Sequence, residues 1–185
     1  REKYGFFSII DEAHAFGALG EGGRGIARPV ADVAVGTFGK ALGLFGAFVL
    51  LPQALREYLF NFSSPFIYST ALPEAHAASA LDILEIIAAS DKKRKTLRDI
   101  SRTMKDALLA EGFKVKGDAQ IIALEVGNEN SAANFSRELL ARDIFVFPAR
   151  YPTVPLGKAI LRIGMTALHG EEDVKFFIAS LKDIS

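Results

Sequence analysis

The stretch AVGTFGKALG (Ala34–Gly43) contains a single lysine, Lys40, among glycines and apolar residues, with Thr37 three positions before it. The flanking segments Ala31–Val35 and Leu44–Leu51 are strongly apolar apart from Gly46. Strands are predicted over Ala31–Val35 and Gly46–Leu51, so the lysine is expected at a strand end. Because desolvation disfavours an ammonium ion, a lysine in such surroundings can supply the neutral amine that a Schiff-base lysine needs. The alternative is a snorkelling lysine, with its stem on apolar surface and its head in water.

Composition limits the classes of protein to consider. The chain has 185 residues, 50% of them apolar and 24% charged, which is enough for one ordinary domain or two small ones. Its formal net charge is zero, so we expect neither nucleic acid nor a membrane surface as a partner. The absence of cysteine excludes disulfides and thiolate metal sites, fits a cytoplasmic protein, and leads us to expect no metal centre. The apolar run Ala41–Leu51 stops at Pro52 and is too short to span a bilayer.

A second apolar run, Phe6–Ile10, predicts a strand covered on both faces, as in a parallel sheet. Asp11 and His14 follow it, and ligands of open α/β sheets bind outside the carboxyl ends of strands, so both residues are placed for chemistry. Asp-Glu-Ala-His also occurs in ATP-dependent helicases, but the phosphate loop that they need has no match in this sequence. A strand so near Arg1 suggests that the chain belongs to something longer.

Two patterns along the chain are of the kind that bind phosphate. Gly20–Gly25 matches Gly-x-Gly-x-x-Gly, but it follows a loop rather than a strand, so we interpret it as a flexible loop. Ser69 and Thr70 end a short apolar segment just before a predicted helix start at Pro73. Hydroxyls beside a helix N-terminus often hold a phosphate, and a plain helix cap is the equally open alternative.

The chain is predicted to have three parts. Residues 1–72 are interpreted as the remnant of a large α/β domain, residues 73–112 as one or two linking helices, and residues 113–185 as a small α+β domain. Further strands are expected over residues 113–116, 120–126, 144–148 and 159–164. Helices are expected over residues 52–60, 75–89, 131–142 and 171–184, the second of them buried on most faces and the third capped by Ser131.

Two arginines in the last part are candidates for binding an anion. Arg150 lies in the proline-rich loop Pro148–Pro155, and Arg162 lies inside the predicted strand Ile160–Ile163. An arginine among apolar strand residues usually has a carboxylate or phosphate partner. A structural ion pair is an equally open alternative for each of them.

Four segments together resemble the α-oxoamine synthases, pyridoxal-phosphate (PLP) enzymes of the aspartate-aminotransferase fold. They are IIDEAHAFGALGEGGRG (9–25), VGTFGKALG (35–43), IYSTALP (67–73) and ARYPTVPLGKAILRIGMTALH (149–169). The resemblance implies part of a PLP-transferase large domain followed by a small α+β C-terminal domain. It also implies that what family members carry before this part is absent here, so the chain alone is expected to be impaired in binding cofactor.

The resemblance assigns roles around the cofactor. Lys40 would form the Schiff base with PLP and later move the Cα proton of the substrate. Asp11 would pair with the pyridinium nitrogen, and His14 would hydrogen-bond the phenolic oxygen. Thr37 would bind the phosphate.

Other roles concern a neighbouring subunit and the substrate. Ser69 and Thr70 would reach the phosphate held by the neighbouring subunit, which implies a homodimer with a shared active site. Arg162 would clamp the carboxylate of the amino acid, with Arg150 as second candidate. Relatives usually have a small residue where this chain has Phe45.

The implied reaction is a decarboxylating condensation of an amino acid with an acyl-CoA, which releases coenzyme A and carbon dioxide. Within the family, the segments most resemble the branch that joins L-alanine to a pimeloyl thioester and so makes a biotin precursor. The glycine C-acetyltransferase, 5-aminolevulinate synthase and serine palmitoyltransferase branches remain alternatives. So do an aminotransferase of the same fold and a truncated, non-catalytic homologue.

Overall fold

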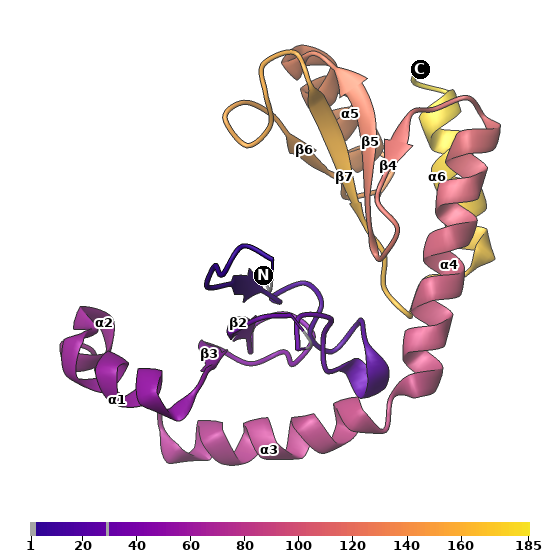
Figure 1. Cartoon of the computed structure of the whole chain (residues 1–185). Coiled ribbons are helices and arrows are strands. Elements are labelled where there is room, and N and C mark those ends of the chain that lie inside the picture. The colour runs from indigo at the N-terminus through magenta and orange to yellow at the C-terminus, as the bar shows by residue number, and fades with distance from the viewer. Residues whose placement is uncertain (1–2, 29) are drawn as a thin grey trace. The chain divides into compact units, whose positions relative to one another are not determined.

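The computed structural model describes residues 3–28 and 30–185, which form two compact units, unit 1 (Arg1–Arg94) and unit 2 (Lys95–Ser185) (Figure 1). The elements of unit 1 are β1 (Ile9–Asp11), the 3-10 helix η1 (Glu21–Gly23), β2 (Val33–Thr37), β3 (Ala47–Leu50), α1 (Gln53–Phe62), α2 (Ser64–Ile67) and α3 (Glu74–Ala88). Helix α4 (Asp91–Ala110) begins in unit 1 and continues into unit 2. Unit 2 adds β4 (Val115–Lys116), β5 (Ile121–Gly127), α5 (Glu129–Leu140), β6 (Phe147–Ala149), β7 (Ala159–Gly164) and α6 (Glu171–Lys182).

The sheet of unit 1 has three strands in the order β1-β2-β3. β1 is parallel to β2, with Asp11 paired to Val35, as expected for strands of an α/β domain. β3 is antiparallel to β2, with Ala47 paired to Thr37. The connection over residues 38–46 is too short for the crossover that a parallel strand needs, so the chain turns back on itself.

β1 is shorter and more exposed than predicted. Phe6 and Ile9 are 52% and 68% exposed, so the prediction of a strand covered on both faces is wrong for the described chain. β1 is an edge strand with β2 as its neighbour. Before it, Ser8 is held on the side of β2: its backbone N and its Oγ donate to Asp32 Oδ2 at 2.9 and 3.0 Å, and its carbonyl accepts from Val33 N at 3.0 Å.

Prolines mark the starts of two helices in unit 1. Pro52 and Pro73 are the N-cap residues of α1 and α3, close to the predicted starts. The short helix α2 was not predicted, and it reaches into the apolar segment before Ser69. The buried residues of α3 are Ala80 and Ile87, while Leu81 is 67% exposed, so the prediction that this helix is buried on most faces is wrong for the described chain.

Unit 2 is built on a four-stranded antiparallel sheet in the order β4-β5-β7-β6, which confirms the strands predicted there. β7 has the predicted bounds, and Ala159, Leu161 and Ile163 alternate inward along it. The cap of α5 differs from the prediction. Asn128, not Ser131, is the N-cap residue, and its side chain accepts a 2.8 Å hydrogen bond from Ser131 N.

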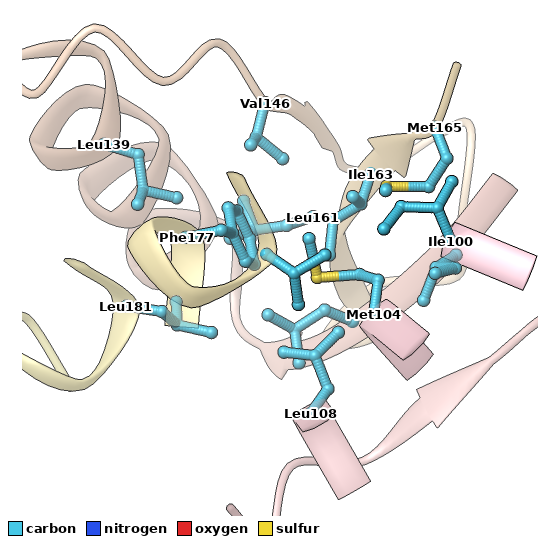
Figure 2. Close-up of a cluster of buried hydrophobic side chains, with 13 residues drawn as sticks. Ile100, Met104, Leu108, Leu139, Val146, Leu161, Ile163, Met165, Phe177 and Leu181 are labelled. Carbon is cyan, nitrogen blue, oxygen red and sulfur yellow. The ribbon is translucent and has the colours of Figure 1, made fainter. Parts of the chain in front are cut away.

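The core of unit 2 lies between this sheet and three helices (Figure 2). Leu108 from α4, Leu139 from α5 and Leu181 from α6 are fully buried, as are Leu124 and Leu161 of the sheet. Since large side chains from every layer interdigitate, this half of the chain has what a stable small α+β domain requires.

Among residues 3–28 and 30–185, no helix is both long enough and apolar enough to cross a membrane.

Candidate functional site

Asp11 and His14 lie at the carboxyl end of β1. The Asp11 carboxylate is exposed, and its Oδ1 accepts a 2.8 Å hydrogen bond from Ala13 N, which fixes the first turn after the strand. Glu12 N donates to Val35 O at 2.7 Å, so the pairing with β2 continues one residue beyond β1. His14 is exposed on the turn that follows. The predicted placement of both side chains at a strand end is confirmed.

Lys40 lies in a tight loop between β2 and β3, which we call the lysine loop (residues 38–46). Thr37, the last residue of β2, ties the loop together: its Oγ1 donates to Gly46 O at 3.1 Å and accepts from Gly39 N at 3.0 Å. Leu44 N donates to Phe38 O at 2.7 Å. These bonds fix the backbone around an exposed Lys40 side chain, so burial within unit 1 does not desolvate its amine.

The His14 turn and the lysine loop are packed against each other. A β-carbon built on Gly17 would lie 2.4 Å from Ala41 Cβ, so only a glycine permits this approach. The rings of Phe16 and Phe38 both contact Phe48 of β3, with centroid distances of 4.9 and 5.1 Å. The structure therefore brings together the segments that carry Asp11, His14, Thr37 and Lys40.

The segment with Ser69 and Thr70 reaches the same region. Leu72 Cδ1 would be 3.2 Å from a β-carbon on Gly46, and the His76 ring lies 5.6 Å from that of Phe38. Both hydroxyl residues are exposed, and Ser69 Oγ donates to Pro65 O. The alternative of a plain helix cap is wrong, because the N-cap residue of α3 is Pro73 and no side chain caps that helix.

The two arginines belong to unit 2. Arg162 is half-buried on β7, where it pairs with Ala123 of β5 and Phe147 of β6, on the sheet face opposite the core residues Leu161 and Ile163. Arg150 is exposed directly after β6, and its carbonyl accepts from the backbone of the following turn. The structure thus gathers six of the eight candidate residues in unit 1 and two in unit 2.

Six of the eight candidate residues are exposed and two, Thr37 and Arg162, are half-buried, and all of them lie outside a cavity found in unit 1. That cavity has a volume of about 460 Å³ and is lined by apolar groups such as Phe16 and Phe48 together with Glu12, and by none of the eight candidates. Phe45, beside the lysine loop, is 77% exposed. In the part of the chain that the structure describes, no cluster of three or more His, Asp or Glu side chains could hold a metal ion.

Sequence reasoning missed two buried charged residues, Glu12 and Arg94, which are 5% and 4% exposed. Arg94 donates to the carbonyls of Ile87 and Ala88 and binds Asp91 at 2.7 Å, so it closes the end of α3. A β-carbon on Gly23 would lie 2.8 Å from Arg94 Nη1, so the glycine-rich loop rests on the same arginine. Nothing in the sequence distinguishes Arg94 from its solvated neighbours in the charged run of residues 91–95.

Comparison with known proteins shows the family of the chain. The model of the family "Aminotransferase class I and II" matches residues 1–181. The chain belongs to this family. Among its relatives are the 8-amino-7-oxononanoate synthases of Pelobacter propionicus, 40% identical over 182 residues, and Anaeromyxobacter dehalogenans, 39% identical over 189 residues. The matches cover 94% and 99% of this chain but 46% and 48% of those proteins, so the chain spans about half the length of the curated relatives it matches.

Solved structures give the same fold. Serine palmitoyltransferase from Sphingomonas wittichii superposes with a TM-score of 0.89 at 28% identity, covering 99% of this chain and 48% of that one. 8-Amino-7-oxononanoate synthase from Francisella tularensis superposes with a TM-score of 0.85 at 28% identity, covering 95% and 53%. A further similar structure is that of serine palmitoyltransferase (SPT) with a PLP internal aldimine. It superposes with a TM-score of 0.89 at 28% identity, covering 99% of this chain and 48% of that one. The predicted fold class and family resemblance are confirmed.

Proposed function

We propose that this chain belongs to a PLP-dependent acyltransferase of the 8-amino-7-oxononanoate synthase type, which condenses L-alanine with pimeloyl-CoA in making a biotin precursor. The observation that carries the proposal is the packing of the His14 turn on the lysine loop, where Gly17 meets Ala41. It places a carboxylate, an imidazole and an amine at one edge of two adjacent parallel strands.

The donor set fits PLP. Asp11 offers a carboxylate for a pyridinium nitrogen, and its second oxygen has no hydrogen bond among the described residues. His14 offers a ring nitrogen for a phenolic oxygen, and Lys40 an exposed amine for an aldehyde. Thr37 fits less simply. Its hydroxyl proton is already donated to Gly46 O, so binding a phosphate would compete with holding the lysine loop closed.

Within this proposal each side chain has a separate task. PLP, when bound, would act as an electron sink for bonds broken at the Cα of the amino acid. Asp11 would hold the proton on the ring nitrogen, and Lys40 would move the Cα proton. Arg162 would orient the substrate carboxylate, with Arg150 as the second candidate, because a guanidinium binds a carboxylate through two parallel hydrogen bonds.

The quaternary arrangement is part of the proposal. Ser69 and Thr70 are exposed, so their hydroxyls are accessible to a cofactor held by a second copy of the chain. We therefore propose a homodimer with a shared active site. As a separate point, we propose that the protein is cytoplasmic. We also propose that the large-domain remnant (residues 1–72) holds the cofactor and that the small domain (residues 113–185) binds the substrate. Residues 73–112 would connect these two parts.

Titration of the purified chain with PLP tests the cofactor assignment. Binding by the chain alone is expected to be weakened, but still to give a visible absorption band that saturates at high PLP concentration. We expect Lys40→Ala to abolish this band because no other amine lies in the lysine loop. Lys93→Ala removes an exposed lysine of α4 and is the matched control, which should keep the band. No saturable binding by the parent chain would favour the non-catalytic homologue, and a band that survives Lys40→Ala would contradict the role of Lys40.

A product assay separates the reaction types. Release of free coenzyme A that depends on an amino acid supports a synthase, whereas turnover of an α-keto acid without coenzyme A release identifies an aminotransferase. Supplying L-alanine, glycine and L-serine in parallel distinguishes the sister branches, among which serine palmitoyltransferase is favoured by the structural similarity. Preference for L-serine with a long acyl chain would replace the proposed substrates.

A further inference from the structure

Glu12 lies in the sequence between the candidate residues Asp11 and His14, and its side chain is buried whereas theirs are exposed. It is 5% exposed, and its Oε1 accepts hydrogen bonds from Ile26 N at 2.7 Å and from Ala27 N. Its own backbone N–H pairs with Val35 O of β2. One residue therefore joins the end of β1, the neighbouring strand and the far end of the glycine-rich loop.

The loop is shaped around this carboxylate. A β-carbon built on Gly25 would lie 2.7 Å from both Cδ and Oε2 of Glu12, so the carboxylate occupies the space that any other residue would fill. Gly25 also has a φ of 80°, a conformation that glycine adopts without strain. The fit is specific to this side chain, because two backbone donors and one close packing contact converge on it.

The closed loop contains the residues that the proposed function needs. Residues 12–27 include His14, and they include Gly17, whose close approach to Ala41 sets the distance between the His14 turn and the lysine loop. Gly17 N donates to Gly23 O at 2.7 Å and Gly25 N donates to Leu19 O at 3.0 Å, so the loop is cross-linked internally as well. These bonds connect the far end of the loop to the turn at His14.

We propose that Glu12 is a positioning residue: its buried carboxylate closes the loop of residues 12–27 and so fixes Asp11 and His14 relative to the lysine loop. The effect on cofactor binding rests on the proposed function, whereas the closure of the loop does not.

Two substitutions distinguish the hydrogen bonds of Glu12 from its charge. Glu12→Ala leaves the part-buried N–H of Ile26 and the buried N–H of Ala27 without their acceptor, which is the costly way to lose a hydrogen bond. Glu12→Gln keeps an acceptor oxygen, and its new amide NH₂ replaces Oε2, which has no hydrogen-bond partner among the described residues. We therefore expect the glutamine to restore most of what the alanine loses.

The experiment measures three properties of the parent chain, Glu12→Ala, Glu12→Gln and Glu21→Gln. They are amide hydrogen exchange at Ile26 and Ala27, the NMR signals of the His14 imidazole, and PLP affinity by titration. Glu21 is an exposed glutamate of the same loop and serves as the matched control. For Glu12→Ala we expect exchange at both amides to rise about tenfold or more, the His14 signals to shift or broaden, and PLP affinity to fall about tenfold.

The outcomes separate the inference from the proposed function. Unchanged exchange and unchanged His14 signals in Glu12→Ala would overturn the inference, whatever the chain binds. Faster exchange with unchanged His14 signals and unchanged PLP affinity would also overturn the inference, because Glu12 would then stabilise the loop without positioning His14. If the parent chain binds no PLP, the proposed function fails, and the exchange and NMR readouts still decide whether Glu12 positions His14.

A second pair of variants tests the inference if Glu12→Ala does not fold. Gly25→Ala places a methyl group where the Glu12 carboxylate lies, and should cause the same changes at Ile26, Ala27 and His14. Gly22→Ala is its control, because Gly22 also has a positive φ of 58° in this loop but a β-carbon built on it would make only an ordinary contact, 3.9 Å from Arg24 Nε. Equal effects of both substitutions would show that backbone strain, and not displacement of Glu12, disturbs the loop.

Discussion

The two units of this chain differ in what holds them together. All six of the largest fully buried side chains belong to unit 2. The buried hydrophobic residues of unit 1 are few and mostly small: Ala15, Ala27, Val33, Leu42, Ala80 and Ile87. Unit 1 instead uses close glycine contacts and side-chain hydrogen bonds to backbone groups, of which Glu12 and Arg94 make the most buried ones.

This difference suggests that unit 2 supplies most of the stability, whereas unit 1 contains most of the candidate site. Burial of large apolar side chains is the main source of folding free energy, so unit 2 should be the stable half. Unit 1 contains the candidate cofactor residues on loops whose shape depends on a few polar contacts, and such regions open at lower free energy. Substitutions in the two units test this division, beginning with the largest expected effect.

Leu161→Ala, in the core of unit 2, should be strongly destabilising. Leu161 is fully buried, so its truncation should cost about 3 kcal/mol of unfolding free energy. Leu156→Ala is the matched control, because Leu156 is 75% exposed and its loss should cost almost nothing. Urea denaturation followed by circular dichroism measures both. Equal effects of the two would remove the evidence that unit 2 has the tighter core.

Leu42→Ala truncates a buried side chain of unit 1 and should have a smaller, more local effect. Leu42 is 4% exposed, but its chain neighbours Ala41 and Gly43 are exposed, so we expect the lysine loop to relax and the loss to be at most about 2 kcal/mol. Hydrogen exchange should become faster in β1 and β2 and stay unchanged in β5 and β7. Faster exchange in both sheets would show that the units unfold together and would break the comparison.

Asn128→Ala removes the cap of α5 in unit 2. The Asn128 side chain satisfies Ser131 N, and losing such a cap typically costs about 1 kcal/mol. Asn130→Ala changes a nearby asparagine within the same helix and is the control. The denaturation midpoints of the two variants give the measurement. A cap that contributes nothing would give identical midpoints.

Lys105→Met should have the smallest effect, which depends on pH. The hydrogen bond and the charge of Lys105 hold the pKa of Asp118 below its ordinary value of 3.8. Because this pKa is lowered in the folded state, the pair stabilises the fold above pH 3.8, and that contribution is lost as the pH falls through the folded-state pKa.

We therefore expect Lys105→Met to lower the denaturation midpoint slightly at neutral pH and to flatten its decline on acidification. Lys93→Met, on an exposed lysine of the same helix, should leave the decline unchanged. Screening by added salt should reduce the difference between the parent chain and Lys105→Met, as expected for an exposed ion pair. A difference that persists in acid and salt would point to packing of the lysine stem.

Sequence patterns predicted unit 2 more accurately than unit 1. In unit 2, alternation along Ala159–Gly164 predicted β7 with its bounds, because one face of that strand is buried and the other is not. In unit 1, apolar runs predicted that β1 and β3 exist but not their exposure or the direction of β3. An apolar run predicts a hydrophobic strand. It does not predict which strands lie beside it or in which direction they run, because these depend on how the chain turns.

The candidate site was only partly accessible from sequence. Spacing placed Asp11, His14, Thr37 and Lys40 at strand ends, and the parallel pairing of β1 with β2 confirms that edge. The positioning role proposed for Glu12 could not be read from sequence, because it depends on a loop that brings Ile26 back beside β1. The glycines of residues 17–25 were the available indication, since a residue without a β-carbon permits other groups to approach the backbone closely.

Chemical trapping of the cofactor tests the role of Lys40 most directly. The chain is incubated with PLP, reduced with borohydride and digested, and the modified lysine is located by mass spectrometry, with Lys40→Ala treated in parallel. We expect a single modified lysine, Lys40, and no modification of the variant. Label spread over other lysines, or the same label in Lys40→Ala, would contradict the assignment of Lys40 as the Schiff-base lysine.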